Sequence, residues 1–159
     1  MGNLFNAAEV MDMGIEKEKK RRDFYGLAAE KFDNKDMKEL FTKLRDWEES
    51  HIKKFTEIKH GIKELEATSS YPGELENYIN SLVDDALYKQ VSADEFSKNV
   101  KTPLSAIQYG LGFEKDAILF FREMSPYMGK ANKEAVEKLI DEEKQHIVYL
   151  TELKRKLSK

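Results

Sequence analysis

The 159-residue chain contains no cysteine and only three prolines, Pro72, Pro103 and Pro126. Without cysteine the protein cannot form disulfides, bind zinc or iron through thiolates, or use a thiol as a nucleophile. The chain also lacks a long apolar run and a signal-peptide pattern, so neither a membrane span nor secretion is expected. No extended alternation of apolar and polar residues is present, and the segments between the prolines are therefore predicted to be helical.

The chain also has no large excess of positive or of negative charge. Charged residues make up 36% of the chain, but the formal net charge is only −3. A surface of mixed charge favours neither nucleic acid nor an acidic membrane as a partner. With 40% hydrophobic residues, the length suits one compact domain spanning residues 1–159. We expect a soluble, cytoplasmic protein.

Turn and capping signals predict four long helices. Their expected ranges are 6–32, 36–59, 102–123 and 132–157. His60-Gly61 is expected to end the second helix, and Thr102 followed by Pro103 to begin the third. The long crossover between these two helices is predicted to hold a short helix at 74–87 and a further one at 93–100. Two hairpins joined by one long crossover predict an all-α, antiparallel four-helix bundle of ferritin-like connectivity.

The chain contains an internal repeat. Residues 38–59 align with residues 133–154, and about half of the aligned positions are identical. Each copy holds one Glu-x-x-His motif, formed by Glu48 and His51 in the first and by Glu143 and His146 in the second. In the helices that precede the two copies, the motif Gly-x-x-x-Glu also occurs twice, ending at Glu18 and at Glu114. The two hairpins are therefore expected to contribute equivalently to whatever lies between them.

The repeated acidic residues and histidines occupy core positions. In every predicted long helix they continue a stripe of apolar residues spaced by three and four, which is the buried face of an amphipathic helix. Four carboxylates left unpaired in such a core would each cost several kcal/mol or take up protons. Two divalent ions would remove this cost, and oxygen and nitrogen ligands suit iron or manganese, with zinc as an alternative. The competing interpretation is a pair of solvated charged faces that happen to repeat.

This constellation resembles the rubrerythrin family of ferritin-like di-iron carboxylate proteins, in which two helices each give a Glu and two others each give Glu-x-x-His. The resemblance covers nearly the whole chain. It implies six metal ligands, with Glu48 and Glu143 bridging two iron ions, Glu18 and His51 on one ion, and Glu114 and His146 on the other.

The resemblance also implies an activity: a di-iron oxidoreductase that reduces hydrogen peroxide or O₂. Because the chain lacks a rubredoxin domain, electrons are expected from an external donor such as a rubredoxin-like protein. A homodimer is expected on the same ground. Many rubrerythrins carry a further glutamate one turn from the third-helix ligand, but here Leu111 and Ala117 occupy those positions around Glu114, so a redox-linked exchange of ligands is not implied.

Two other functions stay open at this point. One is a ferroxidase or iron-handling protein, and the other is a non-catalytic helical bundle stabilised by a metal ion or built to bind a protein partner. A redox-silent metal such as zinc would accompany the second of these.

Several other residues lie near the predicted ligands in the sequence. Tyr25 is interpreted as a core aromatic residue rather than a hydrogen-bond donor to the site. Arg21 is expected either to pair with a carboxylate outside the ligand set or to reach the surface. Gly14 and Gly110 suit either close helix packing or space for a small oxidant. Glu49 and Glu142 are expected to be surface charges. Asp46 and Asp141 are expected to be solvated rather than to orient the histidines of the opposite copy.

Overall fold

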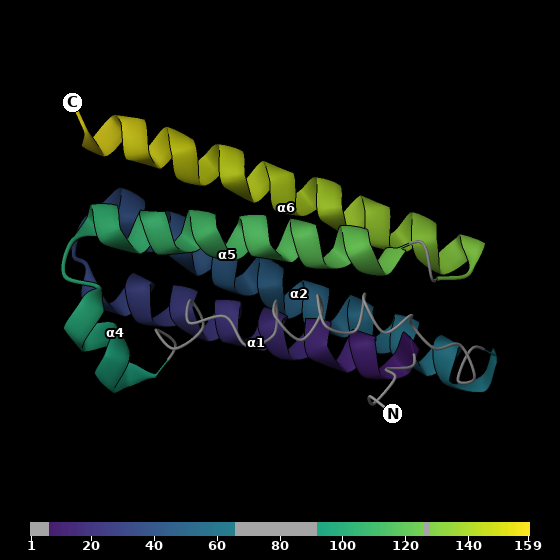
Figure 1. Cartoon of the computed structure of the whole chain (residues 1–159). Helices are drawn as coiled ribbons and strands as arrows, with labels where there is room; N and C mark the ends of the chain where they lie inside the picture. Colours follow the sequence, from purple (N-terminus) through teal and green to yellow (C-terminus); the bar gives the residue numbers. More distant parts are fainter. Residues whose placement is uncertain (1–6, 66–91, 126–127) are drawn as a thin grey trace.

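The computed structural model of the chain describes residues 7–65, 92–125 and 128–159 (Figure 1). Within these ranges the chain is helical and contains no strand. The four long helices are α1 (Ala7–Lys31), α2 (Lys35–Leu65), α5 (Pro103–Met124) and α6 (Lys130–Leu157), and the short helix is α4 (Ala93–Asn99). The predicted all-α class is confirmed. Across the described ranges, no helix combines the length and the apolar character that crossing a membrane requires.

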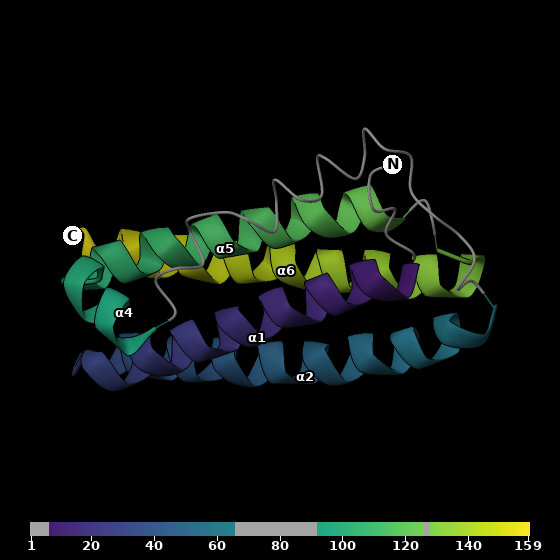
Figure 2. The same cartoon turned by 60° about the horizontal axis from the view of Figure 1, so that its bottom comes forward.

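The long helices form two hairpins that pack on each other. Helix α1 lies along α2 and α5 along α6, while α1 also contacts α5 and α2 contacts α6. Figure 2 shows the α5–α6 hairpin stacked on the α1–α2 hairpin. Helix α2 ends at one end of the bundle and α5 begins at the other (Figure 1), so neighbouring helices run in opposite directions. This is the predicted four-helix arrangement.

Local capping explains where several helices begin. The Asn34 side chain accepts a hydrogen bond from the Met37 amide ahead of α2, and Ser92 caps α4. Thr102 and Ser105 form a reciprocal capping box ahead of α5, and Pro103 occupies its first turn, as expected. The short helix predicted at 93–100 is confirmed as α4. The helix predicted at 74–87 and the predicted start at Asn6 lie outside the described residues.

The predicted end of the second helix at Lys59 is wrong. Helix α2 continues through His60 and Gly61 to Leu65, so His60 does not lie at a helix C-terminus. Among the described glycines none adopts a positive φ. A glycine with ordinary helical dihedrals weakens a helix by about 1 kcal/mol relative to alanine but does not end it, which is why this stop signal failed.

The core is divided into two apolar clusters with a charged layer between them. The first cluster includes Met11, Phe55, Phe120, Phe121 and Leu139. The second includes Phe24, Tyr25, Phe41, Phe113 and Leu150. Along every long helix, the buried charged residues come between the residues of one cluster and those of the other. The two clusters therefore hold the helices together on both sides of the charged layer.

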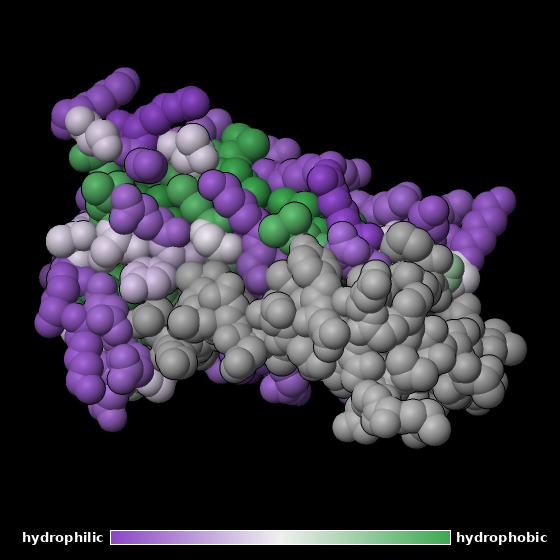
Figure 3. Space-filling view, in the orientation of Figure 1, coloured by the Kyte–Doolittle hydropathy of each residue, from purple (hydrophilic) through white to green (hydrophobic). Residues whose placement is uncertain are grey.

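On the face seen in Figure 3, hydrophilic side chains surround a band of apolar side chains along α5 and α6. Leu104, Leu119 and Val148 are the exposed large hydrophobic residues within the described ranges. Scattered exposed residues of this kind are ordinary for a folded protein. The homodimer stays a prediction.

Gly14 provides a test of helix packing. A Cβ atom at this position would lie 2.8 Å from Cε1 of Phe121 and 3.2 Å from Cε1 of Phe120, whereas at Gly61 it would meet nothing within 4 Å. We expect Gly14→Ala to lower the free energy of unfolding by about 1–3 kcal/mol, because buried rings must shift. The control Gly61→Ala should raise it by about 0.5–1 kcal/mol. Urea unfolding followed by circular dichroism measures both, and equal effects would contradict the close approach.

Candidate metal centre

The six residues predicted as ligands meet in the middle of the bundle. The carboxylates of Glu18, Glu48, Glu114 and Glu143 are fully buried, and the imidazoles of His51 and His146 are nearly so. Helix α1 supplies Glu18, α5 supplies Glu114, and each Glu-x-x-His pair comes from α2 or α6. Solvated faces, the competing interpretation, are therefore excluded. The role of these residues as ligands stays a prediction at this stage.

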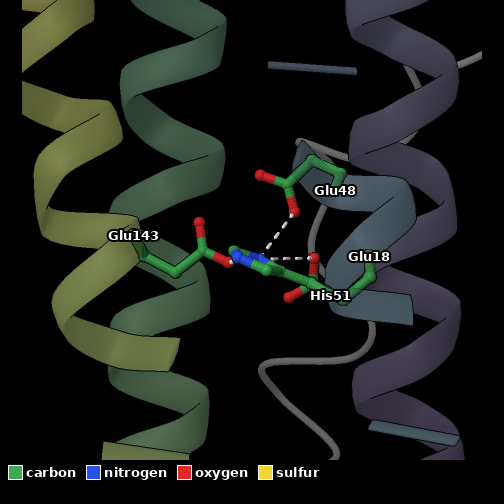
Figure 4. A group of neighbouring side chains, drawn as sticks. All are labelled: Glu18, Glu48, His51 and Glu143. Atoms are coloured by element: carbon green, nitrogen blue, oxygen red, sulfur yellow. Dashed lines mark hydrogen bonds and ion pairs between the residues drawn. The ribbon is translucent and has the colours of Figure 1, made fainter. Parts of the chain in front are cut away.

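The six side chains form two overlapping groups that could each hold a metal ion. One group contains Glu18, Glu48, His51 and Glu143, and the other contains Glu48, Glu114, Glu143 and His146. Within each group, ligand atoms of the four residues lie within 4.8 Å of one another. Figure 4 shows the first group, with the carboxylates of α1, α2 and α6 directed toward the His51 ring. Glu48 and Glu143 belong to both groups, so the geometry is compatible with the bridging role that the resemblance implies, which stays a prediction.

Each shared glutamate offers a different oxygen to each group. Nδ1 of His51 lies 3.6 Å from Oε2 of Glu48 and 2.8 Å from Oε1 of Glu143. Nδ1 of His146 lies 3.3 Å from Oε1 of Glu48 and 3.0 Å from Oε2 of Glu143. Both histidines therefore direct Nδ1 inward, and the two carboxylates lie between them.

Arg21 is part of the same cluster. Its side chain is fully buried, and the guanidinium pairs with Oε1 of Glu18. Nε lies 3.5 Å from Oε2 of Glu48, and Nη2 lies 3.6 Å from Oε1 of Glu143. The surface position is thus wrong for Arg21, whose guanidinium forms ion pairs with three of the predicted ligands. Its spacing of three residues from Glu18 was the available signal.

Tyr25 also contacts the site, contrary to its interpretation as a core residue only. The buried hydroxyl donates a hydrogen bond to Oε1 of Glu114 at 2.5 Å. Burial, and then the negative charges of Glu114 and Glu48, raise the pKa of this phenol well above its usual value. Tyr25 therefore keeps its proton and acts as a fixed donor.

Without metal, the pKa values of the two outer glutamates, Glu18 and Glu114, are raised, and those of the two shared glutamates, Glu48 and Glu143, are lowered. Burial raises the pKa of Glu18; Arg21 acts to lower it, and the charges of Glu48 and Glu143 act to raise it. Burial, and then the charges of Glu143 and Glu48, raise the pKa of Glu114. Burial also acts to raise the pKa of Glu48 and Glu143. For Glu48 the effects of Arg21, Glu18 and His146 outweigh it and lower that pKa. For Glu143 the contacts with Glu114, His146 and His51 do the same.

Both imidazoles favour their protonated form without metal. Burial acts to lower the pKa of each, but the surrounding carboxylates outweigh it. The pKa of His146 rises to about 12 through Glu114, Glu143 and Glu48. That of His51 rises well above its usual value through Glu143, Glu18 and Glu48.

Two further residues hold the histidine rings in place from outside. Oε2 of Glu142 lies 2.9 Å from Nε2 of His51, so a proton on Nε2 is donated to this carboxylate and Nδ1 is left facing inward. The Trp47 ring stacks on His146, with centroids 5.1 Å apart and planes inclined by 12°. Glu142 and Trp47 occupy equivalent positions in the repeat, immediately before a shared glutamate, and neither role was predicted. Glu142 is nevertheless half-exposed, as a surface residue would be.

The other flanking residues match their expected roles. Asp46 pairs with Arg45 and Asp141 with Lys144 on the exposed surface, so neither orients a histidine. Glu49 forms a surface ion pair with Arg22. A Cβ atom at Gly110 would lie 3.3 Å from both Leu150 and Tyr25, and this contact, with that at Gly14, supports close packing as the reason for both glycines.

A surface cavity of about 320 Å³ reaches both histidines. Its lining residues come from α2 and α6 and are Trp47, Ser50, His51, Glu142, Gln145, His146 and Tyr149. A cavity of this kind gives a small molecule access to the edge of the buried cluster.

Comparison with known proteins identifies the fold. No protein-family model and no curated protein sequence matches this chain. Among solved structures, the chain is similar to a candidate ferritin-like diiron-carboxylate protein from Thermotoga maritima, with a TM-score of 0.71 and 21% identity over 98% of both chains. Identity at this level carries the fold and not the activity. The fold is ferritin-like, as the two hairpins and the repeat predicted.

Proposed function

We propose that this protein is a di-iron carboxylate oxidoreductase of rubrerythrin type that reduces hydrogen peroxide with electrons from an external donor. The observation that carries the proposal is the sharing of Glu48 and Glu143 between two ligand groups. These two carboxylates each direct one oxygen toward either histidine, so they could hold both ions. The ligand set of four carboxylates, two imidazoles and no thiolate suits iron.

The buried polar atoms support a fit to metal. Several oxygens in the cluster make no hydrogen bond with any described residue, and most of them lie within ion-pair distance of a neighbour. They are both carboxylate oxygens of Glu18 and of Glu48, and the Oε2 atoms of Glu114 and Glu143. Nδ1 of His146 also makes no hydrogen bond to any part of the described structure. Buried polar atoms are almost always satisfied in native proteins, so these atoms are available to coordinate ions.

The residues of the chain define what the site would do. When bound, two ferrous ions would supply the two electrons that convert one hydrogen peroxide and two protons into two waters, and an external one-electron donor would restore them. Glu48 and Glu143 would hold both ions, while Glu142 fixes the tautomer of His51. Tyr25 holds a proton at its hydroxyl and fixes Glu114. The apolar clusters on both sides exclude bulk water from the layer.

Metal ions and protons would compete for the same side chains. In the metal-free layer the raised pKa values of Glu18 and Glu114 favour their neutral form, and those of His51 and His146 favour imidazolium. The lowered pKa values of Glu48 and Glu143 favour carboxylates. Divalent ions need carboxylates and neutral imidazoles, so binding would displace protons from the first four side chains.

A non-catalytic bundle is the second candidate, because Arg21 already neutralises part of the acidic cluster. A protein of this kind would use the ion pairs for structure alone. It would bind a redox-silent metal or none, and it would not respond to peroxide.

The main test is iron loading under anaerobic conditions. We expect two Fe(II) per chain, oxidised by peroxide at one H₂O₂ per two Fe(II) and reduced again by an added one-electron donor, as followed by the visible spectrum. Glu143→Ala should lose at least one of the two ions, because both positions use this residue. The control Glu137→Ala, an exposed position of α6, should load normally. A folded protein that binds no iron would refute the proposal, and growing mineral with continued Fe(II) consumption would indicate a ferroxidase instead.

Proton release gives an independent measurement. Because Glu18, Glu114, His51 and His146 have raised pKa values in the metal-free protein, two divalent ions should displace up to four protons at pH 7. The apparent affinity for Mn²⁺ should therefore rise with pH between 6 and 8, since protons compete for the same atoms. Titration calorimetry in two buffers of different ionisation enthalpy counts the protons. Binding without proton release would contradict the predicted protonation states.

The cavity beside the histidines provides a test of oxidant access. Ser50 is exposed and lines this cavity, so Ser50→Trp should fill part of it and slow oxidation of the loaded protein by peroxide severalfold. The iron content should stay unchanged. Ser97→Trp, on the exposed face of α4, is the matched control. Equal rates in both variants would show that the oxidant enters elsewhere.

A further inference from the structure

The two candidate metal positions use separate sets of oxygens. The position beside His51 uses Oε2 of Glu48 and Oε1 of Glu143, and the position beside His146 uses Oε1 of Glu48 and Oε2 of Glu143. We refer to them as the His51 position and the His146 position. A group that occupies the oxygens of one position therefore leaves those of the other available.

Arg21 forms ion pairs with the carboxylates of the His51 position. Its nitrogens lie 3.5 Å from Oε2 of Glu48 and 3.6 Å from Oε1 of Glu143, which are the two shared oxygens of the His51 position. The guanidinium also pairs with Glu18, the outer ligand of that position. Arg21 thus contacts all three carboxylates that an ion beside His51 would need.

The repeat shows that this cation is specific to one half of the protein. The residue equivalent to Arg21 in α5 is Ala117, whose side chain is fully buried and carries no charge. On the His146 side, the outer glutamate receives a neutral donor instead, the hydroxyl of Tyr25, on its Oε1 atom. Oε2 of Glu114 makes no hydrogen bond to any described residue. The two positions therefore have the same ligand types and different surroundings.

We propose that Arg21 makes the two metal positions unequal, so that the His146 position binds the first ion tightly and the His51 position binds the second ion more weakly. The proposal rests on the proposed metal centre. A guanidinium and a metal ion compete for the same carboxylate oxygens, and the fully buried side chain has no solvent to move into. Even a displaced guanidinium would remain a like charge near the second ion in a medium of low dielectric constant.

Calorimetric titration of the metal-free protein with Mn²⁺ alone tests this order. The wild type should show two steps whose dissociation constants differ by at least about tenfold, or 1.4 kcal/mol. His146→Ala should remove the tight step and His51→Ala the weak one. Arg21→Met, which removes the charge and keeps an unbranched side chain, should tighten the weak step at least tenfold. Arg22→Met, a surface arginine paired with Glu49, is the matched control and should change neither step.

Electron paramagnetic resonance supplies a second readout that does not depend on activity. At one Mn²⁺ per chain, the wild type should give the spectrum of an isolated ion, and Arg21→Met should give a mixture that includes coupled pairs. Two equal steps in the wild type, or a weak step that survives in His51→Ala, would overturn the inference while leaving the metal centre intact. No Mn²⁺ binding to the folded wild type would overturn both. If Arg21→Met fails to fold, the two histidine variants alone decide the order of filling.

Discussion

The structure depends on the burial of four carboxylates at one level of an apolar bundle. Buried charges need compensating partners. Here Arg21 pairs with the carboxylates, and the raised pKa values of Glu18, Glu114, His51 and His146 favour their protonated forms. Two apolar clusters, one on either side, fix the helices that carry these groups. The carboxylates and imidazoles are therefore held together at one level of the bundle.

The internal repeat explains the symmetry of the layer, and its exceptions explain how the two sides differ. Tyr25 is equivalent to Phe121, which stacks on Phe55 with ring centroids 4.4 Å apart and has no hydroxyl to donate. Glu114 therefore receives a donor from Tyr25, while Glu18 is paired with Arg21. Both outer glutamates thus take their partner from α1, although the glutamates lie in different hairpins. The ligands repeat, but their supporting residues do not.

The sequence predicts the burial of the six candidate ligands correctly because helical spacing alone places Glu-x-x-His within an apolar stripe. Such a stripe has one face, and the face determines which residues are buried. The partners of the ligands depend instead on which side chains meet across helices, and spacing within one helix does not determine that. Arg21 and Glu142 are examples, since one is buried among ligands and the other reaches a histidine from the surface. The end of α2 was misjudged for another reason: glycine lowers helix propensity without setting a boundary.

The distribution of ligands between the hairpins connects metal binding with folding. The first group takes Glu18, Glu48 and His51 from the α1–α2 hairpin and only Glu143 from the α5–α6 hairpin. The second group takes Glu114, Glu143 and His146 from the α5–α6 hairpin and only Glu48 from the α1–α2 hairpin. Neither group can be completed by one hairpin alone. An ion that binds only the docked pair stabilises the docked state by mass action. In the proposed centre Glu48 and Glu143 would therefore have two effects at once, because the residues shared by the two metal positions would also join the two halves of the bundle.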